Sequence, residues 1–226
     1  MKIKMISFDI FQTLVDVNVR IPQIWQGILG KSYTREDGIR GAQIILEHYP
    51  NSLYKALASD RFYTMREVYL DCAESALRQL RLPVEPETVV EHLLRQHSMA
   101  PIYEDVLECM KRLHTKYKII LSSDSNHTMV DGLLDQFIYD DIFISDDLRS
   151  YKGSTDGGFF RQVIERTGMN PEEILHIGDS RSDVLGANRA GAVSCWLNRD
   201  HHIWQHDIRP DYIIHGLMEL TSILNV

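Results

Sequence analysis

From Pro101 to the carboxyl terminus, short apolar segments alternate regularly with amphipathic ones. The apolar segments show no polar–apolar alternation, which is typical of strands that are buried on both faces. This pattern predicts an α/β fold in which helices cover both faces of a parallel sheet. Strands are predicted at 117–122, 142–145, 174–177, 193–197 and 212–214, and helices at 105–115, 127–136, 159–167 and 182–190, with a closing helix from Leu217.

Another strand is predicted near the amino terminus, over Lys2–Asp9, where a mostly apolar run ends on an acid. An ionised carboxylate is costly to bury without a partner, so an acid placed there binds a cation, pairs with a base or takes part in chemistry. A simpler interpretation is that Asp9 only caps the turn after the strand. This stretch alone leaves both interpretations open.

The chain between 16 and 99 has the spacing of helices rather than strands. Apolar residues recur three or four positions apart in Arg66–Leu80, and Thr64 with Glu67 has the pattern of a capping box in front of it. Pro86 suits the first turn of the next helix. An insert of this length is too long for a simple connection between two strands. We therefore predict a sheet core formed by 1–16 and 100–226 and a separate all-helical domain at 17–99.

Polar residues that could carry chemistry stand where the predicted strands end. Asp9 ends the first strand, Ser122 ends the second, and Asp179 and Asp183 follow the strand at 174–177. Lys152 lies in a loop between them. The carboxyl ends of parallel strands share one edge of the sheet, where α/β folds bind ligands. Hard cations take carboxylate oxygens and phosphates bind ammonium groups, so we expect this edge to bind Mg²⁺ and a phosphorylated small molecule.

The composition excludes several other classes of partner. Lysine and arginine total 24 against 32 aspartate and glutamate, a formal net charge of −8, and no long basic run is present. This balance argues against nucleic acid and anionic membranes as partners. The three cysteines are far apart, and no apolar segment has the length of a membrane span or the cleavage site of a secretory signal. We expect a cytoplasmic protein, whose oligomeric state the sequence does not predict.

Together these motifs resemble those of the haloacid dehalogenase (HAD) superfamily of phosphotransferases and hydrolases. The resemblance covers nearly the whole chain and rests on Asp9 with Thr13, on Ser122, on Lys152, and on the run Gly178-Asp-Ser-Arg-Ser-Asp183 followed by Gly-Ala and Ala-Gly. That last run is the most specific of them. The resemblance implies a Rossmann-like, HAD-like core and an inserted helical cap that closes over the site and selects the substrate.

The resemblance also implies catalytic roles. Asp9 would be the nucleophile that forms an aspartyl-phosphate, or an ester in the dehalogenating members. Ser122 would hold a phosphate oxygen, and Lys152 would neutralise the nucleophile and the transferring group. Thr13 belongs to the same motif as Asp9 and is a further candidate catalytic residue. This division is physically sensible, because phosphoryl transfer depends mainly on positioning and charge neutralisation.

The implied cofactor is Mg²⁺. Its ligands would be Asp9, Asp179 and the backbone carbonyl of Phe11. Asp183 would complete the acidic site, either as a direct ligand or through a water molecule.

Phe11 departs from the family pattern. Phosphatases of the family carry Asp-x-Asp-x-Thr, in which the second Asp is the general acid and base, and this chain has Phe11 at that position. Phe can neither protonate a leaving alkoxide nor activate water, a contribution of about 10²–10⁴ in rate. Because the implied Mg²⁺ ligand here is a backbone carbonyl, the departure affects turnover rather than metal binding.

Three hypotheses remain. The first is a magnesium-dependent hydrolase of phosphate esters or acyl phosphates whose leaving groups need no proton. The second is a haloacid dehalogenase, which resembles Asp-x-Tyr-x-Thr and uses no metal, or a phosphonate hydrolase. The third is a module with little or no catalytic activity that binds a phosphorylated ligand or a protein. We favour the first, because the carboxylates of Asp179 and Asp183 would repel the carboxylate of a haloacid.

Other polar residues have simpler interpretations. His176 is expected to pack against the sheet, with a role at the edge of the site as the alternative. The four polar residues after the second predicted strand are expected to cap the helix that follows, with phosphate contact as the alternative; they are Ser123, Asp124, Ser125 and Asn126. Three histidines within 201–206 have no metal-ligand spacing and are expected to lie in a solvated loop. The loop after Lys152 is longer than in the family, which could displace this lysine from the site.

Overall fold

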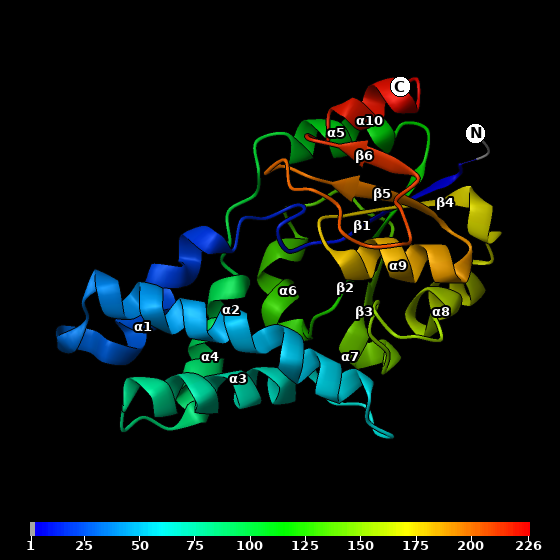
Figure 1. Cartoon of the computed structure of the whole chain (residues 1–226). Helices are drawn as coiled ribbons and strands as arrows, with labels where there is room; N and C mark the ends of the chain where they lie inside the picture. Colours follow the sequence, from blue (N-terminus) through cyan, green and yellow to red (C-terminus); the bar gives the residue numbers. More distant parts are fainter. Residues whose placement is uncertain (1–2) are drawn as a thin grey trace. The chain divides into compact units, whose positions relative to one another are not determined.

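The computed structural model describes residues 3–226, except for the side chain of residue 21. Contacts divide the chain into two compact units (Figure 1). The sheet unit contains the described residues up to Val15, Ile102–Asp124 and Gln136–Val226. The helical unit contains Asp16–Pro101 and Ser125–Asp135. Lys2, at the start of the first predicted strand, lies outside the described residues.

The sheet unit is built on one sheet, in which every pair of neighbouring strands is parallel. The prediction of a Rossmann-like α/β core is therefore confirmed. Within the described residues the strand order is β3-β2-β1-β4-β5-β6. The strands are β1 (Met5–Phe8), β2 (Lys118–Ser123), β3 (Asp141–Ile144), β4 (Ile174–Gly178), β5 (Val193–Leu197) and β6 (Tyr212–Ile214).

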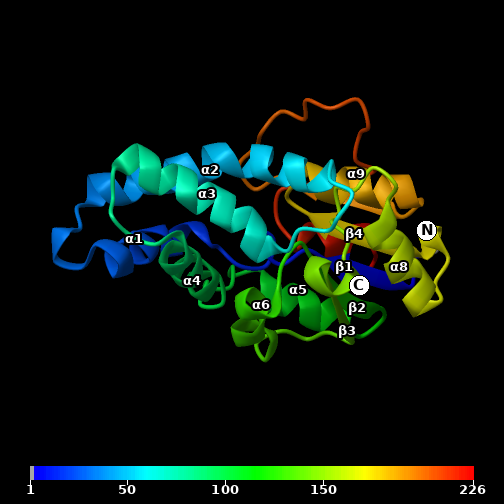
Figure 2. The ribbon, with the colours of Figure 1, turned by 90° about the horizontal axis from the view of Figure 1, so that it is seen from below.

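Helices cover both faces of this sheet. α8 and α9 are on one face, where Met5 of β1 and Ile120 of β2 meet Phe159 and Phe160 in one buried cluster. α5 lies on the opposite side of the sheet from α8 and α9 (Figures 1 and 2), and α10 packs against α5. The helices are α5 (Val106–Leu113), α7 (Ser145–Leu148), α8 (Gly158–Thr167), α9 (Arg181–Ala190) and α10 (Glu219–Ile223), with the 3₁₀ turn η3 (Pro171–Glu173).

The strand order reverses direction between β1 and β4. The chain leaves β1 for β2 on one side and leaves β4 for β5 on the other side. In open parallel sheets, ligands bind beyond the carboxyl ends of the strands at such a switch point. Asp9 directly follows β1, and Asp179 directly follows β4. The topology therefore brings these two acids to the point where a ligand site is expected.

Most predicted elements are present, with shifts of one or two residues at their ends, but β1 begins at Met5, three residues later than predicted. β5 and β6 have the predicted bounds. β2 lies one residue later in the chain than predicted, and β3 lies one residue earlier. The sequence analysis did not anticipate α7, which starts at Ser145, the predicted last residue of β3. Its four residues form a single turn, too short for a helical periodicity to be visible.

The helical unit packs its helices around its own core. α2 packs against α1 and α3, and α4 packs against α1, α3 and α6. The capping box before α3 is confirmed, because Thr64 N donates to Glu67 Oε2 at 2.8 Å and Glu67 N donates to Thr64 Oγ1 at 3.3 Å. The elements are α1 (Ile21–Leu29), α2 (Arg35–Leu57), α3 (Met65–Leu80), α4 (Pro86–His97) and α6 (His127–Leu134), with the 3₁₀ turns η1 (Asn18–Arg20) and η2 (Gly30–Ser32).

No helix among residues 3–226 combines the length and the apolar character that a membrane-spanning helix needs.

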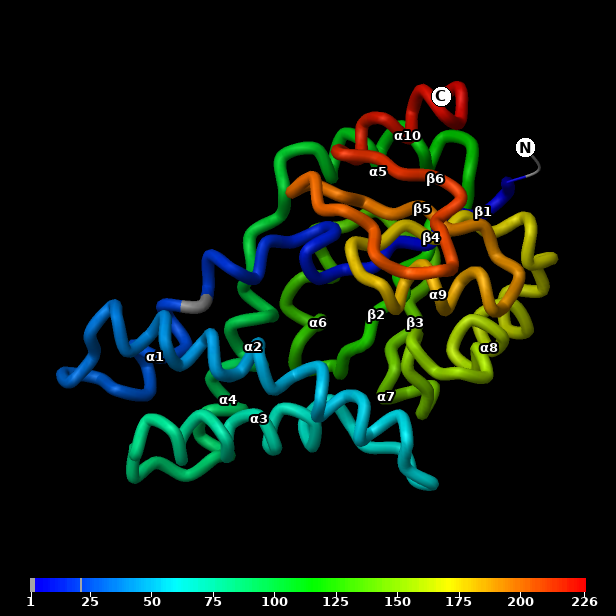
Figure 3. Tube along the Cα trace, viewed as in Figure 1, coloured from blue at the N-terminus to red at the C-terminus, as the bar shows by residue number. Residues whose placement is uncertain are grey.

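The segments that join the units after Val15 and before Ile102 run next to each other, as Figure 3 traces. Val15 and Ile102 form an antiparallel bridge, and Asp16 N donates to Pro101 O at 2.9 Å. The helical unit also includes α6, whose residues the sequence analysis assigned to the sheet core at 100–226. α6 follows β2 in the chain but packs against α4, a contact that sequence order does not reveal.

The buried His97 in α4 predicts a loss of stability in acid. Burial lowers its pKa to about 4, so the folded protein binds fewer protons than the unfolded chain between about pH 6.5 and pH 4. Stability therefore falls as the pH drops through this window, by up to about 3 kcal/mol. In denaturant titrations at pH 7, 5.5 and 4, His97→Gln should show a flatter dependence than the wild type. The exposed-histidine control, His127→Gln, should follow the wild type, and an equal slope for all three proteins would contradict the prediction.

Candidate active site

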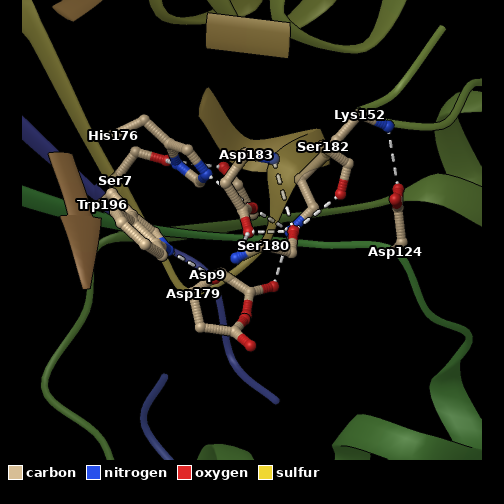
Figure 4. A network of polar contacts seen from close by, with 11 residues as sticks. Ser7, Asp9, Asp124, Lys152, His176, Asp179, Ser180, Ser182, Asp183 and Trp196 are labelled. Carbon is tan, nitrogen blue, oxygen red and sulfur yellow. Dashed lines mark hydrogen bonds and ion pairs between the residues drawn. The ribbon is translucent and has the colours of Figure 1, made fainter. Parts of the chain in front are cut away.

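A buried lysine joins two acids at the switch point (Figure 4). Lys152 Nζ donates to Asp9 Oδ1 at 2.6 Å and also to Asp183 Oδ1. The side chain of Lys152 is only 3% exposed. The long loop that carries Lys152 has therefore not displaced it from the predicted nucleophile. Its ammonium stands between the acid that follows β1 and the acid in the first turn of α9.

Asp183 accepts hydrogen bonds on both carboxylate oxygens. Oδ1 contacts Lys152 Nζ and lies 2.9 Å from His176 Nε2. Oδ2 accepts from the backbone N–H of Ser180 at 3.0 Å and from the Ser180 hydroxyl. Ser180 and Asp183 form the capping box of α9, which also places a negative charge favourably at the amino end of this helix. The turn after β4 therefore fixes Asp183 firmly.

Asp9, Asp179 and Asp183 form a compact acidic group. Each offers a carboxylate oxygen, and these oxygens lie within 4.8 Å of one another. Among the described residues this is the only group of three or more histidine, cysteine or acidic side chains with such spacing. One ammonium group would not balance three ionised carboxylates. Oxygen donors at this spacing suit a hard divalent cation such as Mg²⁺.

The pKa values of Asp9 and Asp179 are raised in this acidic group. Burial raises the pKa of Asp9 to about 7, with a contribution from the charge of Asp183, while the Lys152 ammonium opposes the shift. Burial and the negative charges of Asp9 and Asp183 raise the pKa of Asp179 well above its usual range. Ionising all three acids together is therefore unfavourable, and a bound cation would remove this penalty.

The pKa values of Lys152 and Asp183 shift in opposite directions. Burial alone would raise the pKa of Asp183, but the Lys152 ammonium and the hydrogen bond from His176 bring it far below its usual range. Burial alone would lower the pKa of Lys152, but the charges of Asp183, Asp9 and Asp124 raise it above its usual range. Lys152 and Asp183 are therefore a permanent ion pair beside Asp9.

The hydroxyl groups of the predicted site are buried. Ser122 is fully buried, and a hydrogen bond of 2.8 Å joins its Oγ to Ser7 Oγ. Thr13 is fully buried, and its Oγ1 has no hydrogen-bond partner within residues 3–226. Buried hydroxyls are normally paired, so an unpaired one in the predicted nucleophile motif is consistent with a ligand partner.

Phe11 lies in a tight loop after the predicted nucleophile. The N–H of Gln12 donates to Val15 O at 2.8 Å, and the N–H of Val15 donates to Ile10 O at 3.1 Å, which closes the loop. Gln12 has a φ of 61°, in the left-handed region. The Phe11 side chain is partly exposed. The loop thus presents a solvent-accessible aromatic ring at the position where family phosphatases carry an acid.

Three residues that the sequence analysis did not assign to the site take part in its hydrogen bonds. Ser7 bonds both Ser122 and His176, Asp124 Oδ1 accepts from the N–H of Lys152 at 2.9 Å, and Trp196 Nε1 donates to Asp179 O at 2.8 Å. The predicted capping of α6 is confirmed at Asn126, whose side chain accepts from the N–H of Met129, and not at Asp124. Burial raises the pKa of Asp124 to about 6. Polar residues within otherwise apolar strands, as at Ser7 and His176, were the available signal.

The histidines within 201–206 lie outside this site, as expected. The ring of His201 stacks on His215 with centroids 4.2 Å apart, and His206 packs edge-on against Trp204. The one metal-type grouping found in the described part of the chain contains no histidine.

Gly186 in α9 allows the close approach of the Lys152 backbone. A Cβ atom at this position would lie 2.2 Å from Lys152 O and 2.7 Å from the ring of Phe160. Gly186→Ala should therefore push the Lys152 loop away and lower the free energy of unfolding by about 1–3 kcal/mol. Gly216→Ala is the matched control, since its Cβ would meet Asp105 at an ordinary 3.6 Å. Equal unfolding temperatures for both variants would show that the loop is not packed as described.

Comparison with known families identifies the class of protein. The profile of the haloacid dehalogenase-like hydrolases matches residues 3–191. The chain therefore belongs to this family, as its motifs indicated.

Particular relatives fall into more than one functional group. Pyrophosphatase PpaX of Bacillus mycoides (strain KBAB4) is 27% identical, over 100% of this chain and 98% of the relative. The structure of the HAD-hydrolase YfnB from Bacillus subtilis bound to magnesium has a TM-score of 0.84 at 21% identity, covering 100% of both chains. The defluorinating L-2-haloacid dehalogenase Rha0230 has a TM-score of 0.82 at 19% identity, covering 99% of this chain and 96% of the other. The pyrophosphatase relative supports a phosphatase-type enzyme, and the two solved structures share the fold.

Proposed function

We propose that this protein is a magnesium-dependent hydrolase of phosphorylated small molecules that works through an aspartyl-phosphate on Asp9. The observation that carries the proposal is the contact of Lys152 with both Asp9 and Asp183, beside a third carboxylate, Asp179. Such a buried arrangement suits a reaction in which a negatively charged group must approach a negatively charged nucleophile. Phosphoryl transfer is such a reaction, and it depends on positioned positive charge.

The first step would transfer the phosphoryl group to the protein. A carboxylate oxygen of Asp9 forms a bond to phosphorus while the bond from phosphorus to the leaving oxygen breaks, and the electron pair departs with that oxygen. Lys152 holds the nucleophile in place and offsets the charge that gathers on the phosphoryl oxygens. The hydroxyl groups of Ser122 and Thr13 are buried donors available to this group.

The second step would release phosphate. Water attacks the aspartyl-phosphate, the bond between phosphorus and Asp9 breaks, and the carboxylate is restored. Phe11 has no proton to exchange with this water. We therefore expect the second step to be slow relative to the first.

The residues present fit a Mg²⁺ ion. Asp9, Asp179 and the backbone carbonyl of Phe11 would hold it, with Asp183 as a direct or water-mediated partner. Bound there, the ion would supply charge neutralisation to the phosphoryl group. The raised pKa values of Asp9 and Asp179 support a cation at this position, since a bound cation would stabilise the ionised form of both acids. The magnesium in the YfnB structure supports the same cofactor.

Phe11 narrows the substrate class. Without a general acid, the leaving group must depart unprotonated, which a phosphate or carboxylate does far more readily than an alkoxide. We therefore propose phosphoric anhydrides, such as pyrophosphate or acyl phosphates, as better substrates than simple phosphate esters. The similarity to pyrophosphatase PpaX supports this choice.

The helical unit would be the cap that selects the substrate, as the place of its larger part, Asp16–Pro101, between β1 and β2 suggests. The domain division 1–16 and 100–226 for the core and 17–99 for the cap remains a proposal. The three cysteines are free and buried, which supports a reducing, cytoplasmic environment. The proposed partner is a phosphorylated small molecule and not nucleic acid or a membrane.

A substrate panel tests the proposed function. The wild type should release phosphate from pyrophosphate and acetyl phosphate in the presence of Mg²⁺, more slowly from a simple phosphate ester, and at background rate with EDTA. Release that is unchanged by EDTA would contradict the cofactor. Absence of phosphate release from every compound would contradict the activity.

Dehalogenation is the second candidate, favoured by the aromatic residue at position 11 and by the structural similarity to Rha0230. Its nucleophile would also be Asp9, which would form an ester by displacing the halide. The three clustered carboxylates argue against it, because they would repel the carboxylate of a 2-haloacid. Halide release from 2-chloropropionate in EDTA would select this candidate.

A further inference from the structure

A continuous hydrogen-bond chain links Ser122 to Asp183, and Figure 4 shows its part from Ser7 through His176 to Asp183. Ser122 Oγ is 2.8 Å from Ser7 Oγ, which is in turn 2.8 Å from His176 Nδ1. His176 Nε2 then lies 2.9 Å from Asp183 Oδ1. All four side chains are at most 1% exposed, so water does not compete for these bonds.

The sheet register explains why these residues meet. Ser7 in β1 pairs with His176 in β4, and on its other side β1 pairs with β2, which carries Ser122. Paired residues of neighbouring parallel strands point to the same face. The chain therefore crosses three adjacent strands and reaches the first turn of α9 through Asp183.

Both ring nitrogens of His176 are used in this chain. Nε2 lies within hydrogen-bond distance of Asp183 Oδ1, and Nδ1 lies within hydrogen-bond distance of Ser7 Oγ. The ring of Phe160 packs on His176 at 4.7 Å between centroids, with the two planes at 66°. The histidine therefore cannot rotate without losing both hydrogen bonds and this aromatic contact.

We propose that His176 is a positioning residue which, through Ser7, holds the phosphate-binding hydroxyl of Ser122 in register with the Asp183 carboxylate that fixes Lys152. The inference rests on the proposed function, which assigns phosphate to Ser122 and Mg²⁺ to the acidic group. Nδ1 contacts Ser7, which bonds the proposed phosphate-binding Ser122, and Nε2 contacts Asp183 of the acidic group. A residue that only fills space would not need a separate polar contact at each ring nitrogen.

Two substitutions separate the two nitrogens. The amide of His176→Gln reaches the position of Nε2 and keeps the contact to Asp183, but leaves Ser7 without its partner. The shorter amide of His176→Asn reaches the position of Nδ1 and keeps Ser7, but leaves Asp183 without this donor. Ser7→Ala removes the link between Ser122 and the histidine. Ser194→Ala is the matched control, a buried serine of β5 whose hydroxyl bonds Asp211 outside the site.

Calorimetry with inorganic phosphate and with Mg²⁺, beside the unfolding temperature of each variant, measures the two sides independently of turnover. Ser7→Ala and His176→Gln should each weaken phosphate binding by about fivefold, as expected for one lost hydrogen bond, and leave Mg²⁺ affinity within about twofold. His176→Asn should weaken Mg²⁺ binding by about tenfold, as expected for loss of an outer-shell partner. The double variant Ser7→Ala/His176→Gln should lose no more phosphate affinity than either single variant.

Other outcomes overturn the proposal. If the Gln and Asn variants lose both affinities equally and in step with their unfolding temperatures, His176 is only a packing residue. If neither affinity changes while Ser194→Ala behaves as wild type, the chain does not position the site. If the wild type itself binds neither phosphate nor Mg²⁺, the proposed function has failed first, and the inference falls with it.

Discussion

The Phe11→Asp variant should hydrolyse simple phosphate monoesters about 10²-fold faster than the wild type, the lower end of what a positioned acid and base contributes. The new carboxyl group would stand two residues after the nucleophile, in the loop closed between Ile10 and Val15. It could protonate the leaving alkoxide in the first step and activate water in the second. Because the side chain at position 11 is partly exposed, the substitution does not bury an unpaired charge.

The gain should depend on the substrate. Pyrophosphate and acyl phosphates have leaving groups that need no proton, so their first step should change little and only the release of phosphate should accelerate. Phe11→Asn is the matched control, because asparagine has nearly the same size as aspartate and cannot exchange a proton. Equal monoester rates for Phe11→Asp and Phe11→Asn would contradict the role assigned to this position. A gain that persists when Asp9→Asn is added would show that the reaction does not use Asp9.

The Asp9→Asn variant should lose at least about 10³-fold in phosphate release, because an amide is a far weaker nucleophile than a carboxylate. The substitution preserves the shape of the side chain, and its oxygen can still accept a hydrogen bond from Lys152. It also removes one of the clustered negative charges that raise the pKa of Asp179. We therefore expect the fold to persist while turnover is lost.

Rates and unfolding temperatures should be measured together for this variant. Asp141→Asn is a suitable control, because Asp141 is an exposed acid at the start of β3. Loss of activity in Asp9→Asn at an unfolding temperature close to that of wild type supports the nucleophile. If Asp9→Asn kept activity within about tenfold of wild type, the assignment of Asp9 as the nucleophile would be contradicted.

Much of the sheet unit could be predicted from the sequence, for a physical reason. Strands that are buried on both faces are short apolar runs bounded by turns, and β5 and β6 have the predicted bounds. The acids that follow β1 and β4 could be predicted to converge because carboxyl ends of parallel strands share an edge. The structure adds that β1 and β4 are adjacent and that Lys152 reaches across to both acids.

The chain from Ser122 to Asp183 could not be predicted in the same way. Each member looks like an isolated polar residue in or beside an apolar strand, and only the strand order places Ser7 between β2 and β4. The association of α6 with the helical unit was hidden for a similar reason, since its partner α4 is distant in the sequence. Local patterns predict single elements well, but they do not specify which distant elements touch.

Phe11 leads us to expect slow hydrolysis of the aspartyl-phosphate. Asp9, held by Lys152, should accept a phosphoryl group from an anhydride readily. The Phe11 side chain cannot activate the water that must then hydrolyse the aspartyl-phosphate. The phosphorylated protein should therefore accumulate during turnover. This accumulation is the main difference between the proposed reaction and that of a phosphatase with the usual second Asp.

The most direct test is to find this covalent species. The wild type would be mixed with acetyl phosphate and Mg²⁺, quenched, and reduced with borohydride, which converts an aspartyl-phosphate to homoserine, before peptide mass spectrometry. We expect homoserine at position 9 in the wild type, less of it in Phe11→Asp, and none in Asp9→Asn or with EDTA. An unmodified Asp9 in wild type that is actively releasing phosphate would contradict the central claim, as would labelling at another residue.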